Sequence, residues 1–180
     1  MKDIPPSGVL GPWWPKNAAP HYLTAIPHTS GTAQFCAFPR IASRGHVFVD
    51  APVFLLYGKH WNRHKGFGVV HILAEHGNEI PLKHYHGSVR PRIVPMCPKH
   101  PSPDALDAVA RFVANICSHR AGINCEFNGM RGDHRPLIIK GLAGTVVLEL
   151  RDCSETGSPY YSVVTAMTAT NVRGTQIGSL

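Results

Sequence analysis

The spacing of the apolar residues changes near residue 122, and this change constrains the fold more than any other feature of the sequence. Before it, two segments carry apolar residues three or four positions apart, which is helical spacing. After it, short β-favouring runs are separated by Gly, Asp, Ser and Pro. Helices that precede a hairpin-linked sheet are typical of an α+β domain, whereas strands that alternate with helices would build a parallel sheet.

Two helices are predicted. One occupies residues 67–76, where apolar residues recur at helical spacing up to a C-cap at Gly77. The other begins at the cap formed by Ser102-Pro103-Asp104 and ends before Ala121-Gly122. The apolar stripe of each helix has to be buried against another layer of the domain.

The predicted fold class is therefore α+β, with two helices packed on a three- to four-stranded antiparallel sheet. The sheet is expected to be a meander from the last third of the chain. Two earlier β-favouring runs, separated by Asp50-Ala51-Pro52, are either two short strands or one strand broken at a turn. All the predicted strands, in chain order, are 47–49, 53–57, 123–127, 137–140, 145–151 and 160–168.

The first 45 residues differ in composition from the rest of the chain. They hold seven prolines with little periodicity, a composition that resists helix and interrupts strand ladders. We predict an irregular Pro-rich lead-in over 1–45, of which part packs through its aromatic residues, and one α+β domain over 46–180. A chain of 180 residues is long enough to bury its own core.

The chain is basic, with 18 Lys and Arg against 11 Asp and Glu and a formal charge of +7. Such a charge favours a nucleic acid or an anionic surface as partner, although solubility alone explains it equally well. The N-terminus lacks the apolar stretch of a signal peptide, and no apolar run approaches the roughly 18 residues needed to span a bilayer. We therefore expect a cytoplasmic protein with no membrane segment.

Histidine is concentrated in one part of the chain. Seven of the 12 His lie between positions 60 and 100, interleaved with Lys and Arg. Imidazoles titrate near neutrality, and fixed cations stabilise the phosphorane that forms when the 2′-hydroxyl of RNA attacks its own phosphate. One interpretation is acid–base catalysis on RNA, with Lys65, Lys83, Arg90 and Arg92 as candidate substrate-binding residues.

The spacing of these histidines does not signal a metal site. His60 and His64 lack the Glu of an H-E-x-x-H motif, and His71 and His76 are five residues apart, so their rings point about 140° apart on a helix. The five cysteines include no C-x-x-C pair. No metal or other cofactor is therefore expected. The alternative is that most of these histidines are solvated surface residues.

The last predicted strand carries hydroxyl groups on both faces. Strict alternation places Tyr161, Val163, Thr165 and Met167 on one face. A hydroxyl such as that of Thr165 can bind a phosphate oxygen, although β-propensity alone also explains a Thr in a strand.

Two short motifs resemble those of a known superfamily. They are Lys65-Gly-Phe-Gly-Val-Val-His-Ile-Leu-Ala-Glu-His76 and Tyr160-Tyr-Ser-Val-Val-Thr-Ala. They resemble the "GFG-HI-x-x-x-H" helix and the "YY-V-x-T" strand of the barnase/EndoU/colicin/RelE-like toxin ribonucleases, of phage and polymorphic-toxin type. The resemblance covers residues 50–170; the Pro-rich first third and a His-, Lys- and Pro-rich insertion at 80–101 depart from it.

The resemblance implies a metal-independent endoribonuclease that cuts tRNA or other RNA and leaves a 2′,3′-cyclic phosphate. It also implies a cognate immunity protein and, for a delivered toxin, entry into a target-cell cytoplasm through a secretion system. Helix histidines would act as base and acid, beside a strand hydroxyl, an aromatic residue and a basic group from the central strands. The implied catalytic set is His71, His76, Lys140, Arg151, Tyr161 and Thr165.

Two other functions stay open. One is a non-enzymatic nucleic-acid-binding module whose basic insertion contacts phosphates. The other is a zinc-dependent hydrolase built from the same histidines. The sequence contains no Walker loop, G-x-G-x-x-G or G-x-S-x-G motif, which weighs against nucleotide binding and esterase activity.

Overall fold

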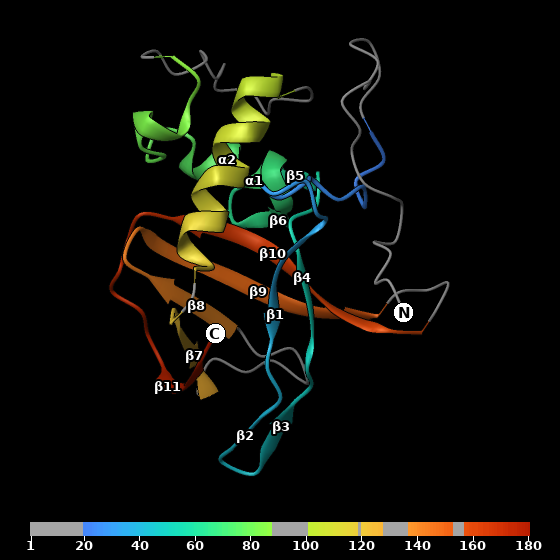
Figure 1. The fold of residues 1–180 in the computed structure, drawn as a ribbon, viewed down its shortest axis with the longest axis vertical. Helices are drawn as coiled ribbons and strands as arrows, with labels where there is room; N and C mark the ends of the chain where they lie inside the picture. Colours follow the sequence, from blue (N-terminus) through green and yellow to red (C-terminus); the bar gives the residue numbers. More distant parts are fainter. Residues whose placement is uncertain (1–19, 88–100, 119, 128–136, 153–156) are drawn as a thin grey trace.

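A computed structural model describes residues 20–87, 101–118, 120–127, 137–152 and 157–180. Its main element is a seven-stranded mixed sheet in the order β1-β4-β10-β9-β8-β7-β11, curled into a half-barrel (Figure 1). The strands are β1 (Gln34–Phe38), β4 (Ala51–Phe54), β7 (Gly122–Cys125), β8 (Leu137–Gly141), β9 (Gly144–Asp152), β10 (Pro159–Met167) and β11 (Thr175–Ser179).

The prediction of a three- to four-stranded antiparallel sheet is wrong. The meander β7–β8–β9–β10 does form, with antiparallel pairing throughout. However, β11 extends it beyond β7, and β4 and β1 extend it beyond β10. Since β4 runs parallel to β10, the sheet is mixed. Strand accounts for 42% of the structure and helix for only 20%, so the helices cover a large sheet.

The expectation of an irregular segment before residue 45 is also wrong for part of that segment. Residues 1–19 lie outside the described residues, but β1 and β2 (Ile41–Ser43) both lie within the Pro-rich region. Pro27 and Pro39 flank β1 and therefore remove no hydrogen bond from its ladder. A register shift between Gln34 and Cys36 breaks the alternation that would have marked the strand.

Both predicted helices are confirmed. Helix α1 spans Gly68–His76 and is followed by Gly77 as its C-cap. Helix α2 spans Pro103–Ile116, and the Ser102 side chain accepts a hydrogen bond from the backbone N–H of Ala105 at 3.2 Å. The apolar stripes of both helices join the main core, which also contains one face of the sheet. Helix α1 packs against β10, and this contact positions the histidines of α1.

Two short hairpins complete the fold. One pairs β2 with β3 (His46–Phe48), and the other pairs β5 (Lys59–Asn62) with β6 (Lys65–Phe67). The second hairpin leads directly into α1. Gly58 precedes it and Gly68 follows it, both with positive φ. A Cβ at Gly68 would lie 2.9 Å from the Cα of Gly58, so the two ends of the hairpin approach more closely than larger residues allow.

His84 is a buried histidine away from α1. It ends the 3₁₀ turn η1 (Leu82–His84), its ring centroid lies 5.5 Å from that of Phe112 of α2 in a tilted arrangement, and its Nε2 has no hydrogen-bond partner among the described residues. Burial, followed by the positive charges of Lys83 and Arg111, lowers its pKa from the usual 6.5. The folded state therefore takes up this proton less readily than the unfolded chain.

We expect His84 to make the protein less stable in acid. The pKa of His84 is lower in the folded state than in the unfolded chain. Its contribution to the free energy of unfolding is therefore fully present above about pH 6.5 and falls as the pH drops below that value. The free energy of unfolding from urea titrations at about pH 7.5 and about pH 5.5 tests this. The decrease in the free energy of unfolding from the higher to the lower pH should be smaller in His84→Met than in the wild type. Equal losses would show that His84 does not contribute.

Among the residues that the structure describes, no helix combines the length and apolar character needed to cross a bilayer.

Candidate active site

His71 is the buried centre of a cluster of histidines on α1 and the β5–β6 hairpin. Its side chain is 5% exposed, and its Nδ1 lies 3.0 Å from Nδ1 of His60 on β5. The two rings are stacked, with centroids 5.3 Å apart. One of the two nitrogens has to donate the proton and the other has to accept it. Burial lowers the pKa of His71, and the neighbouring His60 lowers it further, which favours a neutral imidazole.

Gly66 on β6 makes room for the ring of His71. A Cβ at this position would lie 2.5 Å from the carbonyl oxygen of Lys59 and 2.7 Å from Nδ1 of His71. Both distances are shorter than van der Waals contact permits, so only glycine lets β6 pass this close to the imidazole. The "GFG" part of the helix motif therefore has a steric role next to a histidine of the same motif.

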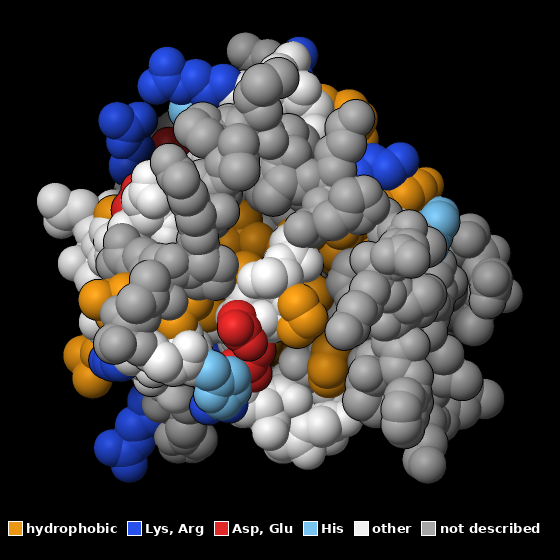
Figure 2. All heavy atoms as spheres, turned by 90° about the horizontal axis from the view of Figure 1, so that it is seen from above, with side chains coloured by type: hydrophobic (Ala, Val, Ile, Leu, Met, Phe, Trp, Pro, Cys, Tyr) orange, Lys and Arg blue, Asp and Glu red, His pale blue; other side chains and the backbone are white. Residues whose placement is uncertain are grey.

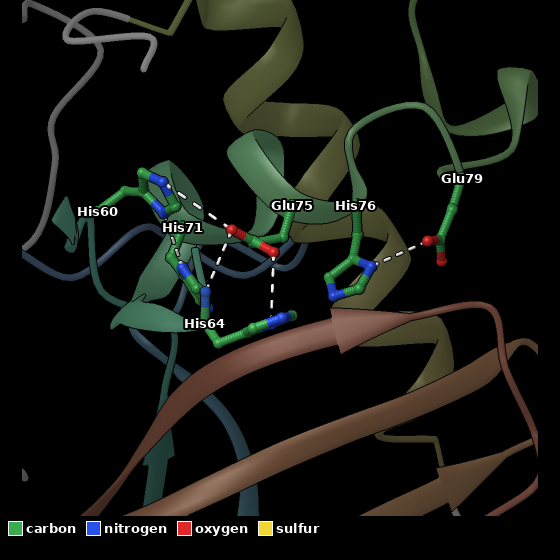
Figure 3. Close-up of polar contacts among 6 residues, drawn as sticks. All are labelled: His60, His64, His71, Glu75, His76 and Glu79. Atoms are coloured by element: carbon green, nitrogen blue, oxygen red, sulfur yellow. Dashed lines mark hydrogen bonds and ion pairs between the residues drawn. The ribbon is translucent and has the colours of Figure 1, made fainter. Parts of the chain in front are cut away.

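Glu75 links the hairpin to the helix (Figure 3). It lies one turn after His71, and its carboxylate is 3.9 Å from Nε2 of His60. The same carboxylate is 3.7 Å from Nδ1 of His64 and accepts the backbone N–H of His64 at 3.4 Å. His64 has a φ of +62° in the hairpin turn, and its side chain is 76% exposed. Glu75, His60 and His71 thus form a chain of polar groups that ends on a buried imidazole.

His76 belongs to a second pair beside this cluster. Its Nδ1 is 2.9 Å from Oε1 of Glu79, and in Figure 3 the two side chains face each other away from His60. The other carboxylate oxygen of Glu79 accepts the hydroxyl of Thr168, just after β10, at 3.5 Å. The structure therefore pairs His76 directly with Glu79, whereas His71 reaches the Glu75 carboxylate only through His60.

Tyr161 and Thr165 occupy different faces of β10, contrary to the prediction from alternation. The register shifts between Val163 and Thr165, so the second half of the strand is offset by one residue. Tyr161 is fully buried in the main core and donates its hydroxyl to the carbonyl of Val49 at 3.0 Å. Burial, helped by Asp50, raises the pKa of Tyr161 to about 12. Its observed contacts are structural.

Thr165 is buried, and its hydroxyl has no hydrogen-bond partner among the described residues. It pairs with Val147 of β9, while Ser162 pairs with Glu149. Side chains of directly paired residues lie on the same face of a sheet, and residues 147 and 149 of β9 share one face. Thr165 therefore shares its face with Ser162, whose buried hydroxyl is also unpaired within the described part of the chain.

The predicted basic residues are dispersed. Arg151 on β9 lies 4.0 Å from the ring centroid of Phe67 and is bound by Glu149 at 2.6 Å. Lys140 is exposed on β8, two strands away from β10. Lys65 is exposed next to the turn that carries His64, and Lys83 is exposed on η1. Arg90 and Arg92 lie outside the described residues.

A cavity of about 740 Å³ lies beside β6, and its lining does not include His60, His71 or Glu75. Gly66, which touches the ring of His71, lines it, and so does Trp61, whose exposed fraction is 64%. Arg151 and Glu149 supply charge, while Val47 and Leu150 add exposed apolar surface. Viewed from above (Figure 2), acidic side chains lie near the middle of the described surface beside a His, and Lys and Arg lie mostly towards its margin.

The sequence did not identify His60, His64 and Glu75 as partners of His71. Glu75 was detectable, because residues four apart on a helix lie on the same face. His60 and His64 come from a hairpin of three- and four-residue strands without β-favouring alternation, so only the folded chain brings them to α1. A metal ion could be bound by three of these residues, because one donor atom from each lies within 4.8 Å of the other two. The three residues are His60, His71 and Glu75.

Comparisons of the chain with protein-family models, with curated proteins and with solved structures find no match.

Proposed function

We propose that the chain is a toxin-type, metal-independent endoribonuclease that cleaves RNA, with tRNA among the candidate substrates, at the histidine cluster of α1. The observation that carries the proposal is the buried His71 imidazole, bonded to His60 and backed by Glu75. In many enzymes a hydroxyl nucleophile is activated by a base that a further polar group orients, and here His60, with Glu75 behind it, is in the position to orient His71.

In this mechanism His71 takes the proton of the 2′-hydroxyl. The 2′-oxygen then forms a bond to phosphorus while the bond from phosphorus to the 5′-oxygen breaks. His76, held by Glu79, gives its proton to that 5′-oxygen. The products are a 2′,3′-cyclic phosphate and a 5′-hydroxyl, and exchange with water restores both histidines. Each histidine thus has one proton-transfer role, with His76 held directly by Glu79 and His71 linked to Glu75 through His60.

The surroundings of the cluster supply a way to hold RNA. Lys59, Arg63 and Lys65 are exposed on the β5–β6 hairpin and place positive charge beside the two histidines that it carries. Trp61 on the same hairpin is exposed over the cavity that Gly66 lines, where a base can stack on it. A base bound in this cavity would contact β6 at Gly66, and the attached phosphate would have to extend past the hairpin to reach His71.

The test is incubation of the purified chain with total RNA in excess EDTA, followed by analysis of the new ends. We expect cyclic-phosphate ends, and a loss of roughly 10²- to 10⁴-fold in His76→Ala. His28→Ala is the matched control, because His28 is also a hydrogen-bonded histidine but lies outside the cluster. Cleavage that requires added zinc would favour the hydrolase alternative. Salt-dependent RNA binding without cleavage would favour a binding module.

A toxin of this kind acts in the cytoplasm of a target cell and is neutralised by an immunity protein in the cell that makes it. Neutralisation is tested by co-expressing this chain with the product of the neighbouring gene in its native genome. That product should relieve the growth arrest that this chain causes, and the relief should require direct binding of the two proteins. A chain that does not arrest growth when expressed alone would contradict the toxin assignment.

A further inference from the structure

The same cluster has the composition of a transition-metal site. Two imidazoles and a carboxylate converge from β5 and α1, with one donor atom from each within 4.8 Å of the others. The Nδ1 atoms of His60 and His71 are 3.0 Å apart. Ligands at about 2.0–2.2 Å from a tetrahedral Zn²⁺ are separated by slightly more than this distance. A small movement of the exposed hairpin would admit an ion between them.

A fourth ligand is within reach. The Nδ1 of His64 lies 3.7 Å from the carboxylate of Glu75, and its ring projects from the turn into solvent. It can therefore rotate towards an ion without disturbing the core. Two or three imidazoles with one carboxylate suit Zn²⁺ and its neighbours in the transition series better than Mg²⁺ or Ca²⁺, which prefer sites made of oxygen ligands.

We infer that His60, His71 and Glu75 bind one divalent transition-metal ion, such as Zn²⁺, and that the bound ion holds the enzyme inactive. Binding requires lone pairs on the coordinating imidazole nitrogens, so the proton shared by His60 and His71 has to leave its position between them. That proton belongs to the same chain of groups that orients His71 as a base. Metal binding and proton transfer therefore exclude each other at this site. The inhibitory part rests on the proposed function, whereas the metal binding does not.

Metal binding is measured on the full chain after chelation and dialysis, by titrating Zn²⁺ against a chromogenic chelator. We expect one Zn²⁺ per chain, and affinities at least about tenfold weaker in His60→Ala and Glu75→Gln. His76→Ala is the matched control, since His76 lies on the same helix but outside the ligand set, and it should bind Zn²⁺ like the wild type. Co²⁺ provides a second readout, because a tetrahedral site gives intense visible absorption that should disappear in His60→Ala.

Inhibition is measured separately, as RNA cleavage over the same Zn²⁺ titration. Activity should fall as the site fills and return when EDTA is added. Failure to bind Zn²⁺ stoichiometrically, or equal binding by all variants, would overturn the metal site. Stoichiometric binding without loss of activity, or with a gain, would overturn the inhibition. If RNA is not cut under any condition while the variants still differ in binding, the metal site stands and the ribonuclease proposal fails.

Discussion

His71→Asn should lower the rate of RNA cleavage by roughly 10²- to 10⁴-fold, the usual contribution of a positioned general base. An Asn amide can replace the hydrogen bond that Nδ1 of His71 makes to His60, but it cannot take up a proton in the relevant pH range. The variant thus removes proton transfer and retains a polar partner inside the cluster. The rate constant for formation of cyclic-phosphate ends, measured in single-turnover reactions, gives the effect directly.

Two controls separate this loss from a loss of structure. His71 is buried, so the free energy of unfolding of His71→Asn has to be measured in parallel, and the assay has to be run where the variant is folded. His28→Asn replaces a histidine whose Nδ1 lies 2.8 Å from the hydroxyl of Ser30, far from α1 in the sequence, and should cleave RNA like the wild type. A folded His71→Asn protein with full activity would remove His71 from the mechanism.

Gly66→Ala should disrupt both the site and the hairpin. The added methyl group would meet the carbonyl oxygen of Lys59 at 2.5 Å and Nδ1 of His71 at 2.7 Å. The carbonyl is part of the paired backbone of β5 and β6, so the ring of His71 or the hairpin itself has to move. Overpacking of this kind costs about 1–3 kcal/mol of stability. A displaced base should also lower cleavage by about 10²-fold, because a shift of about 1 Å in a catalytic group can slow a reaction by that factor.

Gly122→Ala is the matched control for Gly66→Ala. Gly122 lies on β7, and a Cβ there would only make ordinary contacts of 3.5 Å or more with the side chain of Gln176. Its free energy of unfolding and its rate of cleavage should both stay close to those of the wild type. If Gly66→Ala behaved like Gly122→Ala in both measurements, the tight packing between β6 and His71 would not matter for the site.

Local signals in the sequence predicted the elements better than their assembly. The cap at Ser102 and the helical spacing after it located α2, and the runs of the last third located β7 to β10. The size of the sheet was missed because β1 carries a register shift that hides its alternation. The parallel pairing of Val53 with Tyr161 joins residues more than 100 positions apart, and no local pattern reports such a pair.

The difference between local patterns and contacts among distant elements also explains which site residues the sequence predicted. His71 and His76 stand out because they share a helix with a clear apolar stripe, and Glu75 lies one turn from the first of them. His60 reaches His71 only because Gly58 and Gly68 let the hairpin fold back against the start of α1. Thr165 was assigned to the wrong face because alternation cannot anticipate a bulge. Which residues come together in the cluster is determined by contacts between elements, and patterns within one element do not report those contacts.

The position of β10 in the chain bears on when the protein can become active. Helix α1 is synthesised before the strand on which it packs, β10 (Pro159–Met167), which also bridges β4 to β9. During synthesis, therefore, α1 cannot make its contact with the sheet until residues 159–167 have left the ribosome. For a protein that cuts RNA, this order of synthesis would keep an incomplete chain harmless to the ribosome that is still making it.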